Sequence, residues 1–352
     1  MNPRERVLAA LRRKVPDKVP REMGFTPPAL EEFIRRTGAD DPVAYFDYEV
    51  RHAGLAPTHL DVDFTPWVGK LPVGGWVNEW GIGHVPGSMY HFHDYVHPLL
   101  KASTIAEIQA FPLADVGAAY RYAGMAAEVA DWQRKGYAVA GEHPHYSGTI
   151  FECAWLLRGL ENLLSDFLVN PELAEALLDR LTVSAVECAA HLARAGVDIL
   201  ETGDDVGMQT GMMMSPRVWR RWLKPRLAEV IAAARREKAD ILVFYHSDGN
   251  IEDIIPELIE IGVDVLNPIQ PECMDPAKLK REYGHDLAFW GTIGTQTTMP
   301  FGNPEEVKRV VRERIQTVGQ GGGLLLAPTH VIEPEVPWEN VVAFFEAIDE
   351  AG

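Results

Sequence analysis

Two histidines and an aspartate that could bind a metal ion follow apolar stretches in the second half of the chain. His246 and Asp248 come directly after Ile-Leu-Val-Phe-Tyr at 241–245, and His330 follows Leu-Leu-Leu-Ala-Pro-Thr at 324–329. Side chains two residues apart on a strand point to the same face, so His246 and Asp248 can share one site. Two imidazoles and a carboxylate suit zinc or iron(II). They equally suit metal-free acid–base chemistry, in which Asp248 orients His246 and His330 donates a hydrogen bond.

A pair of adjacent carboxylates, Asp204 and Asp205, follows another apolar stretch that begins at Val197. Paired carboxylates can handle a proton when the pKa of one of them is raised. Adjacent residues on a strand point in opposite directions, so we expect only one of the two to face the site. Further candidates for catalysis or for contacts with substrate stand near other predicted strand ends or in the loops that follow them: Arg21, Glu142, His145, Tyr146, Gln209 and Gln270.

The elements that must position these residues alternate regularly along the second half of the chain. Apolar stretches predict strands at 197–201, 241–245, 263–267, 287–290 and 323–326, and helical patterns at 215–237, 251–261 and 304–318 separate several of them. This alternation is typical of βα units around a parallel sheet. The sequence contains neither GxGxxG nor GxxxxGK[ST], which disfavours dinucleotide-binding and P-loop folds. We therefore predict an α/β protein with one domain over residues 1–352, a (β/α)8 TIM barrel whose strand ends converge on one rim.

The first half of the chain is less regular. A helix is predicted at 3–13, a short strand at 21–25, a helical segment at 105–136 and a strand at 136–141. Between about 61 and 100, tryptophans, tyrosines and a phenylalanine alternate with glycines and polar residues, without a helical period. This pattern predicts an aromatic-rich hairpin insertion in the barrel.

Composition excludes several classes of protein. The 352 residues carry a net charge of −18, which disfavours binding to nucleic acid or to an anionic membrane surface. The three cysteines form no CxxC pair, which disfavours a disulfide framework or a cysteine-rich zinc module and fits a reducing compartment. No apolar run approaches the roughly 18 residues that span a bilayer. We expect a cytoplasmic protein that acts on a small molecule.

Three segments of the chain resemble the uroporphyrinogen decarboxylase superfamily. They are residues 246–270, residues 326–341, and the opening Arg-Glu-Arg-Val-Leu-Ala-Ala-Leu at 4–11 with Pro-Asp-Lys-Val-Pro at 16–20. The resemblance implies a single barrel with its site at the carboxyl ends of the strands. It also implies one of two chemistries, decarboxylation or methyl transfer.

The decarboxylase branch binds a macrocycle with eight carboxylates and needs no metal or cofactor. Its Arg-Gln-Ala-Gly-Arg run, which supplies two arginines to those carboxylates, corresponds here to Arg-Glu-Met-Gly-Phe at 21–25. Ligands rich in carboxylates require such arginines. Here only Arg21 remains for this role, and the negative charge of Glu22 disfavours binding of a carboxylate. His330 nevertheless matches the histidine of the branch's Gly-His-Gly motif. A cofactor-free decarboxylase of uroporphyrinogen III or of another acid is therefore one alternative.

The other branch contains the methyltransferases of corrinoid-dependent systems, several of which bind zinc through His-x-Cys and a later cysteine. The resemblance maps these ligands onto His246, Asp248 and His330, so a carboxylate and an imidazole replace both thiolates. Such a harder site suits oxygen-bearing substrates. The resemblance favours methyl transfer or demethylation of a small methoxy or methylamine compound, with zinc or another divalent metal and a corrinoid carried by a separate protein. A homodimer is an expected assembly. The remaining alternative is a non-catalytic barrel that binds a tetrapyrrole or corrinoid.

Overall fold

A curled parallel sheet forms the centre of the computed structural model, which describes residues 1–89, 92–142 and 145–351. Its strands lie in the order β1 (Val50–Ala53), β5 (Ala138–Gly141), β6 (Ile199–Gly203), β9 (Leu242–His246), β10 (Val265–Asn267), β11 (Ala288–Ile293) and β12 (Leu324–Pro328). Every neighbouring pair is parallel, as βα connections require.

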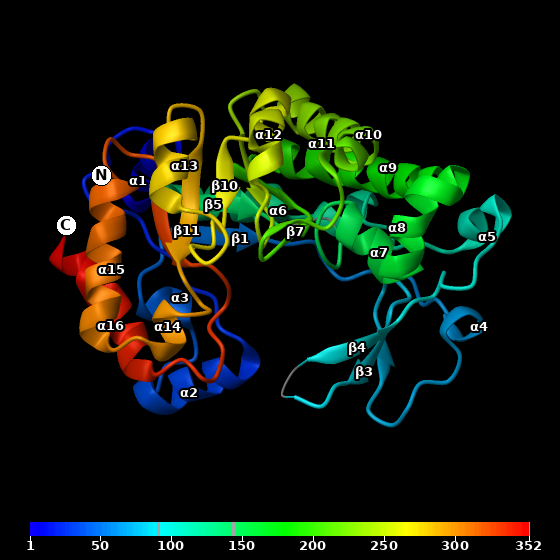
Figure 1. Ribbon diagram of the computed structural model, residues 1–352, viewed down its shortest axis with the longest axis horizontal. Coiled ribbons are helices and arrows are strands. Elements are labelled where there is room, and N and C mark those ends of the chain that lie inside the picture. The colour runs from blue at the N-terminus through cyan, green and yellow to red at the C-terminus, as the bar shows by residue number, and fades with distance from the viewer. Residues whose placement is uncertain (90–91, 143–144, 352) are drawn as a thin grey trace.

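Residues 20–25 extend this sheet beside β12. The backbone of Leu326 donates a hydrogen bond to Pro20 O at 2.8 Å and accepts one from Glu22 N at 3.0 Å. On the other side of the segment, Arg21 N donates to the Glu49 carboxylate at the start of β1. The segment therefore lies between the two edge strands of the curled sheet. The fold is TIM-barrel-like, as the sequence predicts (Figure 1).

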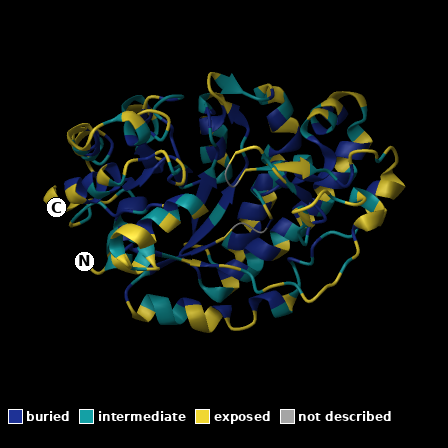
Figure 2. Ribbon diagram, turned by 90° about the horizontal axis from the view of Figure 1, so that it is seen from below, coloured by how far each residue is buried: buried dark blue, intermediate teal, exposed yellow. Residues whose placement is uncertain are grey.

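Helices surround the sheet (Figures 1 and 2), with buried residues in the strands and exposed residues on the outer helices. They are α1 (Pro3–Leu11), α2 (Pro27–Thr37), α3 (Pro42–Tyr45), α4 (Thr65–Val68), α5 (Ile105–Ala110), η1 (Ala119–Tyr122), α6 (Met125–Arg134), α7 (Phe151–Arg158), α8 (Leu160–Val169), α9 (Pro171–Ala195), α10 (Pro216–Trp222), α11 (Lys224–Glu237), η2 (Glu252–Ile254), α12 (Ile255–Ile261), α13 (Pro276–Tyr283), α14 (Thr298–Phe301), α15 (Pro304–Thr317) and α16 (Trp338–Glu350). The prediction of one helical segment at 105–136 was wrong, because irregular chain containing Pro112 separates α5 from α6.

Alternate residues of each strand fill the inside of the barrel. Leu242 and Phe244 of β9 belong to the inner cluster together with Ile199 of β6 and Val50 of β1, whereas Val243 packs in the outer cluster beneath the helices. Because strand side chains alternate with a period of two, His246 continues the inward series of β9 and Glu201 that of β6. Val7 and Leu11 of α1 also belong to this inner cluster.

A small antiparallel sheet projects from the barrel. Its strands are β2 (Trp76–Val77), β3 (Gly83–Pro86) and β4 (His93–Val96), and this region corresponds to the predicted hairpin insertion (Figure 1). We refer to residues 76–96, as far as they are described, as the arm. A second hairpin pairs β7 (Gly207–Met208) with β8 (Gly211–Met212). Among the described residues, no helix combines the length and the apolar character needed to cross a membrane.

Candidate active site

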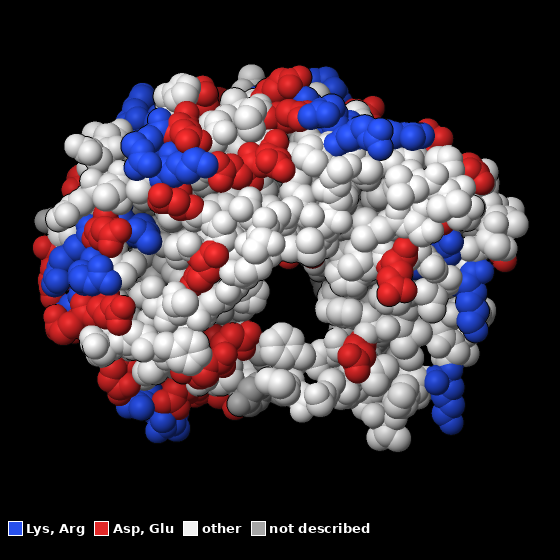
Figure 3. All heavy atoms as spheres, viewed as in Figure 1, with Lys and Arg blue, Asp and Glu red and all other residues white. Residues whose placement is uncertain are grey.

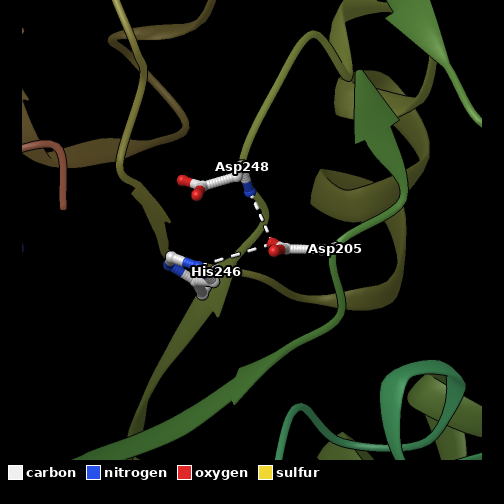
Figure 4. A group of neighbouring side chains, drawn as sticks. All are labelled: Asp205, His246 and Asp248. Atoms are coloured by element: carbon white, nitrogen blue, oxygen red, sulfur yellow. Dashed lines mark hydrogen bonds and ion pairs between the residues drawn. The ribbon is translucent and has the colours of Figure 1, made fainter. Parts of the chain in front are cut away.

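Strands β6 and β9 bring Asp205, His246 and Asp248 together. Their register pairs Gly203 with His246, and an added Cβ on Gly203 would lie 2.4 Å from His246 O. This close backbone approach leads Asp205 directly to the end of β9. One potential ligand atom from each of the three side chains lies within 4.8 Å of the other two, the spacing of a metal-binding group (Figure 4).

Hydrogen bonds fix the orientation of the His246 ring. Asn267 Nδ2 donates to Trp290 O at 2.9 Å, so its Oδ1 faces His246 Nδ1 and must accept a hydrogen from it. In the neutral imidazole, Nε2 therefore carries the lone pair, as a metal-binding histidine requires. Nε2 lies 3.5 Å from Asp205 Oδ1, which also accepts the backbone N–H of Asp248 at 2.7 Å.

Burial and neighbouring charges shift the pKa values of this group. Burial lowers the pKa of His246, but the charges of Asp205, Asp248 and Glu152 and the hydrogen bond to Asn267 together outweigh it and leave that pKa above its usual value. Burial raises the pKa of Asp248, as does the charge of Asp205, while His246 and His330 oppose the shift. The carboxylates and imidazole thus form one electrostatically coupled unit.

The three side chains fit a divalent metal ion. Asp248 Oδ1 is buried without a hydrogen-bond partner, which is costly for a carboxylate that binds nothing. Together with His246 Nε2 and Asp205 it forms a nitrogen and oxygen donor set that suits zinc or iron(II).

The set differs from the predicted ligands in one member, because Asp205 stands where His330 was expected. His330 follows β12, three strands from β9 in the sheet, whereas Asp205 follows the adjacent strand β6. His330 faces the same cavity as His246 and Asp248.

Asp204 and Asp205 have separate surroundings. Asp204 is buried, and its carboxylate accepts backbone N–H groups of Thr149, Ile150 and Glu152 at 3.0–3.2 Å, where α7 begins. Burial and the charge of Glu152 raise the pKa of Asp204 to about 8. Asp204 therefore caps a helix, and Asp205 is the member of the pair that lines the cavity.

Two adjacent cavities occupy the rim of the barrel. The first has a volume of about 480 Å³. Its lining includes the group of Asp205, His246 and Asp248 together with His330, His145, Tyr146 and Glu152. The second, of about 500 Å³, lies toward residues 22–24 and β1. Both are lined by Glu201, Phe244, His246 and His330, so they form two halves of one mouth. Their size falls within the usual range for small-molecule sites.

Three predicted substrate contacts lie outside the lining of these two cavities. Arg21 forms an ion pair with Asp349 at 2.6 Å and donates to backbone carbonyls, because its side chain points outward from the barrel segment. Gln209 lies at the exposed tip of the β7–β8 hairpin and donates to a backbone carbonyl. Gln270 is buried and accepts the Gly249 N–H at 2.7 Å, bracing the loop after β9.

The candidates in the loop after β5 lie close to the mouth. His145 and Tyr146 border the first cavity, and His145 also contacts Ser184 Oγ at 3.1 Å. Glu142 borders a neighbouring cavity of about 380 Å³ that also contacts His145 and Tyr146. His143 and Pro144, part of the same predicted loop, lie outside the described residues.

Three residues of the mouth escaped the sequence analysis. Asn267, which orients His246, ends a predicted strand, and that position was the signal that could have found it. Glu152 accepts the backbone N–H of Asp205 at 3.2 Å from the first turn of α7. His52 of β1 lies between Glu22 and Glu201, with ring nitrogens 2.7 Å and 3.2 Å from their carboxylates. β1 itself was not predicted, so neither was His52.

Comparison with known proteins identifies the family. A family model described as uroporphyrinogen decarboxylase (URO-D) matches residues 147–351. The chain belongs to this family. The match covers more than half of the sequence, including every strand from β6 to β12. The resemblance found in the sequence is thereby confirmed.

Members of both chemistries are similar to this URO-D family chain. A methylcobamide:CoM methyltransferase, MtaA, of Methanosarcina barkeri is 27% identical over 179 residues, 51% of this chain and 49% of that protein. A uroporphyrinogen decarboxylase of Coxiella burnetii is 24% identical over 182 residues, 51% and 48% of the two chains. The chain thus spans about half the length of the curated relatives it matches. Its homologues are enzymes of two reaction types.

A solved structure resembles the whole chain. It is a methyltransferase from Methanosarcina mazei, with a TM-score of 0.69 and 20% sequence identity, and the match covers 100% of this chain and 99% of that one. At this identity the similarity establishes a common fold and leaves the reaction to the chemistry of the site.

Proposed function

We propose that this protein is a methyltransferase that moves a methyl group between a small methoxy or methylamine compound and a corrinoid carried by a separate protein. The observation that carries the proposal is the group of Asp205, His246 and Asp248 at the carboxyl ends of β6 and β9. Barrel enzymes place their chemistry at this rim. The MtaA methyltransferase of Methanosarcina barkeri, a relative of this chain, supports the same reaction class.

The side chains of the mouth have distinct roles in this proposal. Asp205, His246 and Asp248 would hold zinc or another divalent metal, which supplies Lewis-acid polarisation of the atom that bears the methyl group. Asn267 keeps His246 Nε2 turned toward that metal. His330 and Tyr146 border the same cavity and would contact the substrate there.

Decarboxylation of uroporphyrinogen fits the mouth less well. Among the described residues that line the two cavities there is no lysine or arginine, while Glu22, Glu152, Glu201, Asp205 and Asp248 all contribute carboxylates. A macrocycle with eight carboxylates needs cationic partners, which this lining does not provide.

The proposal is tested first by the metal content of the purified protein after incubation with zinc and removal of excess metal. We expect one zinc per chain in the wild type. His246→Ala and Asp248→Ala should lose zinc, with little change in the thermal stability of the metal-free protein, because both residues lie at the rim. His330→Ala should keep zinc, since His330 lies outside the group.

The second measurement is methyl transfer to reduced free cobalamin as a surrogate for the carrier protein, followed by corrinoid absorbance. We expect turnover in the wild type with a methylated donor and none in His246→Ala. Zinc binding that survives in both ligand variants would overturn the metal assignment. If the metal-free protein releases CO2 from an organic acid, decarboxylation becomes the function in place of methyl transfer. Retention of a bound tetrapyrrole or corrinoid without any product would instead indicate a binding protein.

A further inference from the structure

The two cavities at the barrel rim are unusual in their charge. Five carboxylates line them, and the described lining contains no lysine or arginine. In the face shown in Figure 3, Asp and Glu atoms lie on both sides of the central opening, whereas the Lys and Arg atoms lie toward the outer edge. A cavity lined by one sign of charge concentrates ligands of the opposite sign.

Two groups offset part of this charge. Both ring nitrogens of His52 face carboxylates, so its imidazole is protonated between Glu22 and Glu201. A divalent metal at Asp205 and Asp248 would offset two more carboxylates. Counted by formal charge, Glu152 and one carboxylate of the pair flanking His52 remain uncompensated, while burial and the charge of Asp205 raise the pKa of Glu152. The site therefore retains anionic character even with a metal bound.

An aromatic wall lies beside these carboxylates. Phe244 and Trp290, which meet edge to face with ring centroids 5.2 Å apart, line the second cavity together with Tyr48. Glu201 and Phe244 border both cavities, so the carboxylate and the aromatic wall meet where the two halves join. Aromatic faces next to carboxylates are the arrangement by which proteins bind methylated ammonium groups.

From this combination we propose that the substrate of the mouth is an organic cation, with its methyl group carried by a positively charged nitrogen. The proposal rests on the proposed function for the transfer step and narrows its substrate from methoxy or methylamine compounds to methylated ammonium compounds. The cationic nitrogen lies between Glu201 and the wall of Phe244 and Trp290. Its positive charge already activates the carbon–nitrogen bond for cleavage, so this nitrogen, which has no free electron pair, needs no polarisation by a metal. Neutral methyl ethers and negatively charged carboxylates gain no attraction to the carboxylates of the mouth.

The transfer is balanced for such a substrate. The carbon–nitrogen bond breaks and leaves its electron pair on nitrogen, which becomes a neutral amine. The methyl carbon bonds to the reduced cobalt of the corrinoid, which supplies the electron pair. A fixed negative environment stabilises the cationic substrate more than the neutral amine product, and this difference favours substrate binding and product release.

The test compares binding of choline with binding of 3,3-dimethylbutan-1-ol, in which carbon replaces the charged nitrogen at the same shape. Isothermal titration calorimetry on zinc-loaded and on chelator-treated protein measures both. We expect choline to bind about tenfold more tightly than the neutral alcohol in both forms. Glu201→Gln should weaken choline binding and leave binding of the alcohol unchanged. Glu22→Gln provides a second variant, should Glu201→Gln fail to fold.

Glu260→Gln is the matched control, because Glu260 is an exposed carboxylate on α12 paired with Lys224 and should not affect either ligand. Equal affinity for choline and the alcohol, or tighter binding of 3,3-dimethylbutyrate, would overturn the proposal. These outcomes are separate from those of the proposed function. Choline binding without methyl transfer would support the cation site and refute the proposed reaction. Methyl transfer from a methyl ether without choline binding would support the reaction and refute the cation site.

Discussion

Replacement of Asn267 by leucine should weaken zinc binding through His246 without touching a metal ligand. Asn267 Oδ1 accepts the hydrogen of His246 Nδ1, and its Nδ2 donates to Trp290 O at 2.9 Å. Leucine has a similar size and removes both hydrogen bonds. The imidazole can then rotate or change tautomer, so that Nε2 no longer presents its lone pair to the metal.

The magnitude follows from the surroundings of the two partners. Removal of a residue that orients a metal ligand commonly costs about 10–100-fold in affinity. The His246 side chain is 29% exposed, so water replaces part of the lost hydrogen bond, and we expect the low end, about tenfold. Trp290 is buried, and its carbonyl loses a donor that water cannot replace easily. This should lower the free energy of unfolding of the metal-free protein by about 1–3 kcal/mol.

Asn267→Asp separates the two effects. Its carboxylate still accepts the hydrogen of His246 Nδ1 but cannot donate to Trp290 O. Zinc affinity should therefore return to the wild-type value or exceed it, while the loss of stability remains. Competition with a chromogenic chelator measures zinc affinity, and chemical denaturation of the metal-free protein measures stability.

Asn340→Leu is the control for loss of a buried asparagine. Asn340 donates to Met299 O and Gly302 O at 2.8 and 2.7 Å, away from the mouth. This variant should lose stability and keep its zinc affinity. If Asn267→Leu binds zinc as tightly as the wild type, Asn267 does not set the tautomer of His246, and the reasoning is refuted.

Two further predictions concern other carboxylates. Asp204→Ala should lower the free energy of unfolding by about 1–3 kcal/mol in chemical denaturation, because it leaves buried N–H groups of α7 without an acceptor, yet it should keep zinc. Asp205→Ala should lose zinc and keep its free energy of unfolding. Equal loss of zinc in both variants would contradict these separate roles. Hydrogen bonding by Arg220 and Lys224 lowers the pKa of Glu257 from its usual value of 4.5 to about 2, with burial opposing. Its stabilisation is complete above the unfolded-state pKa and is lost as pH falls from 4.5 toward 2. Glu257→Gln should flatten the acid-induced fall in stability over that window, measured by thermal unfolding, and an unchanged profile would refute it.

Much of the framework follows from local patterns in the sequence. Apolar stretches that end in polar residues marked β6 and β9 to β12, because a buried parallel strand needs a continuous apolar run. The period of two placed His246 and Asp248 on one face. The alternation of aromatic residues with glycine marked the arm. By contrast, β1 has only four residues, Val-Arg-His-Ala, and two of them are polar because they face the mouth and the helices, so no pattern revealed it.

Only the tertiary structure decided which side chains meet. Asp205 rather than His330 joins His246 because β6 and β9 are neighbours in register, and sheet order depends on packing among distant segments. Arg21 stands one residue before Glu22, yet it points outward to Asp349 while Glu22 faces His52, since adjacent strand residues alternate sides. A single sequence determines the type and spacing of these residues. Their grouping comes from curling the sheet into a barrel, which brings separate strand ends to one rim.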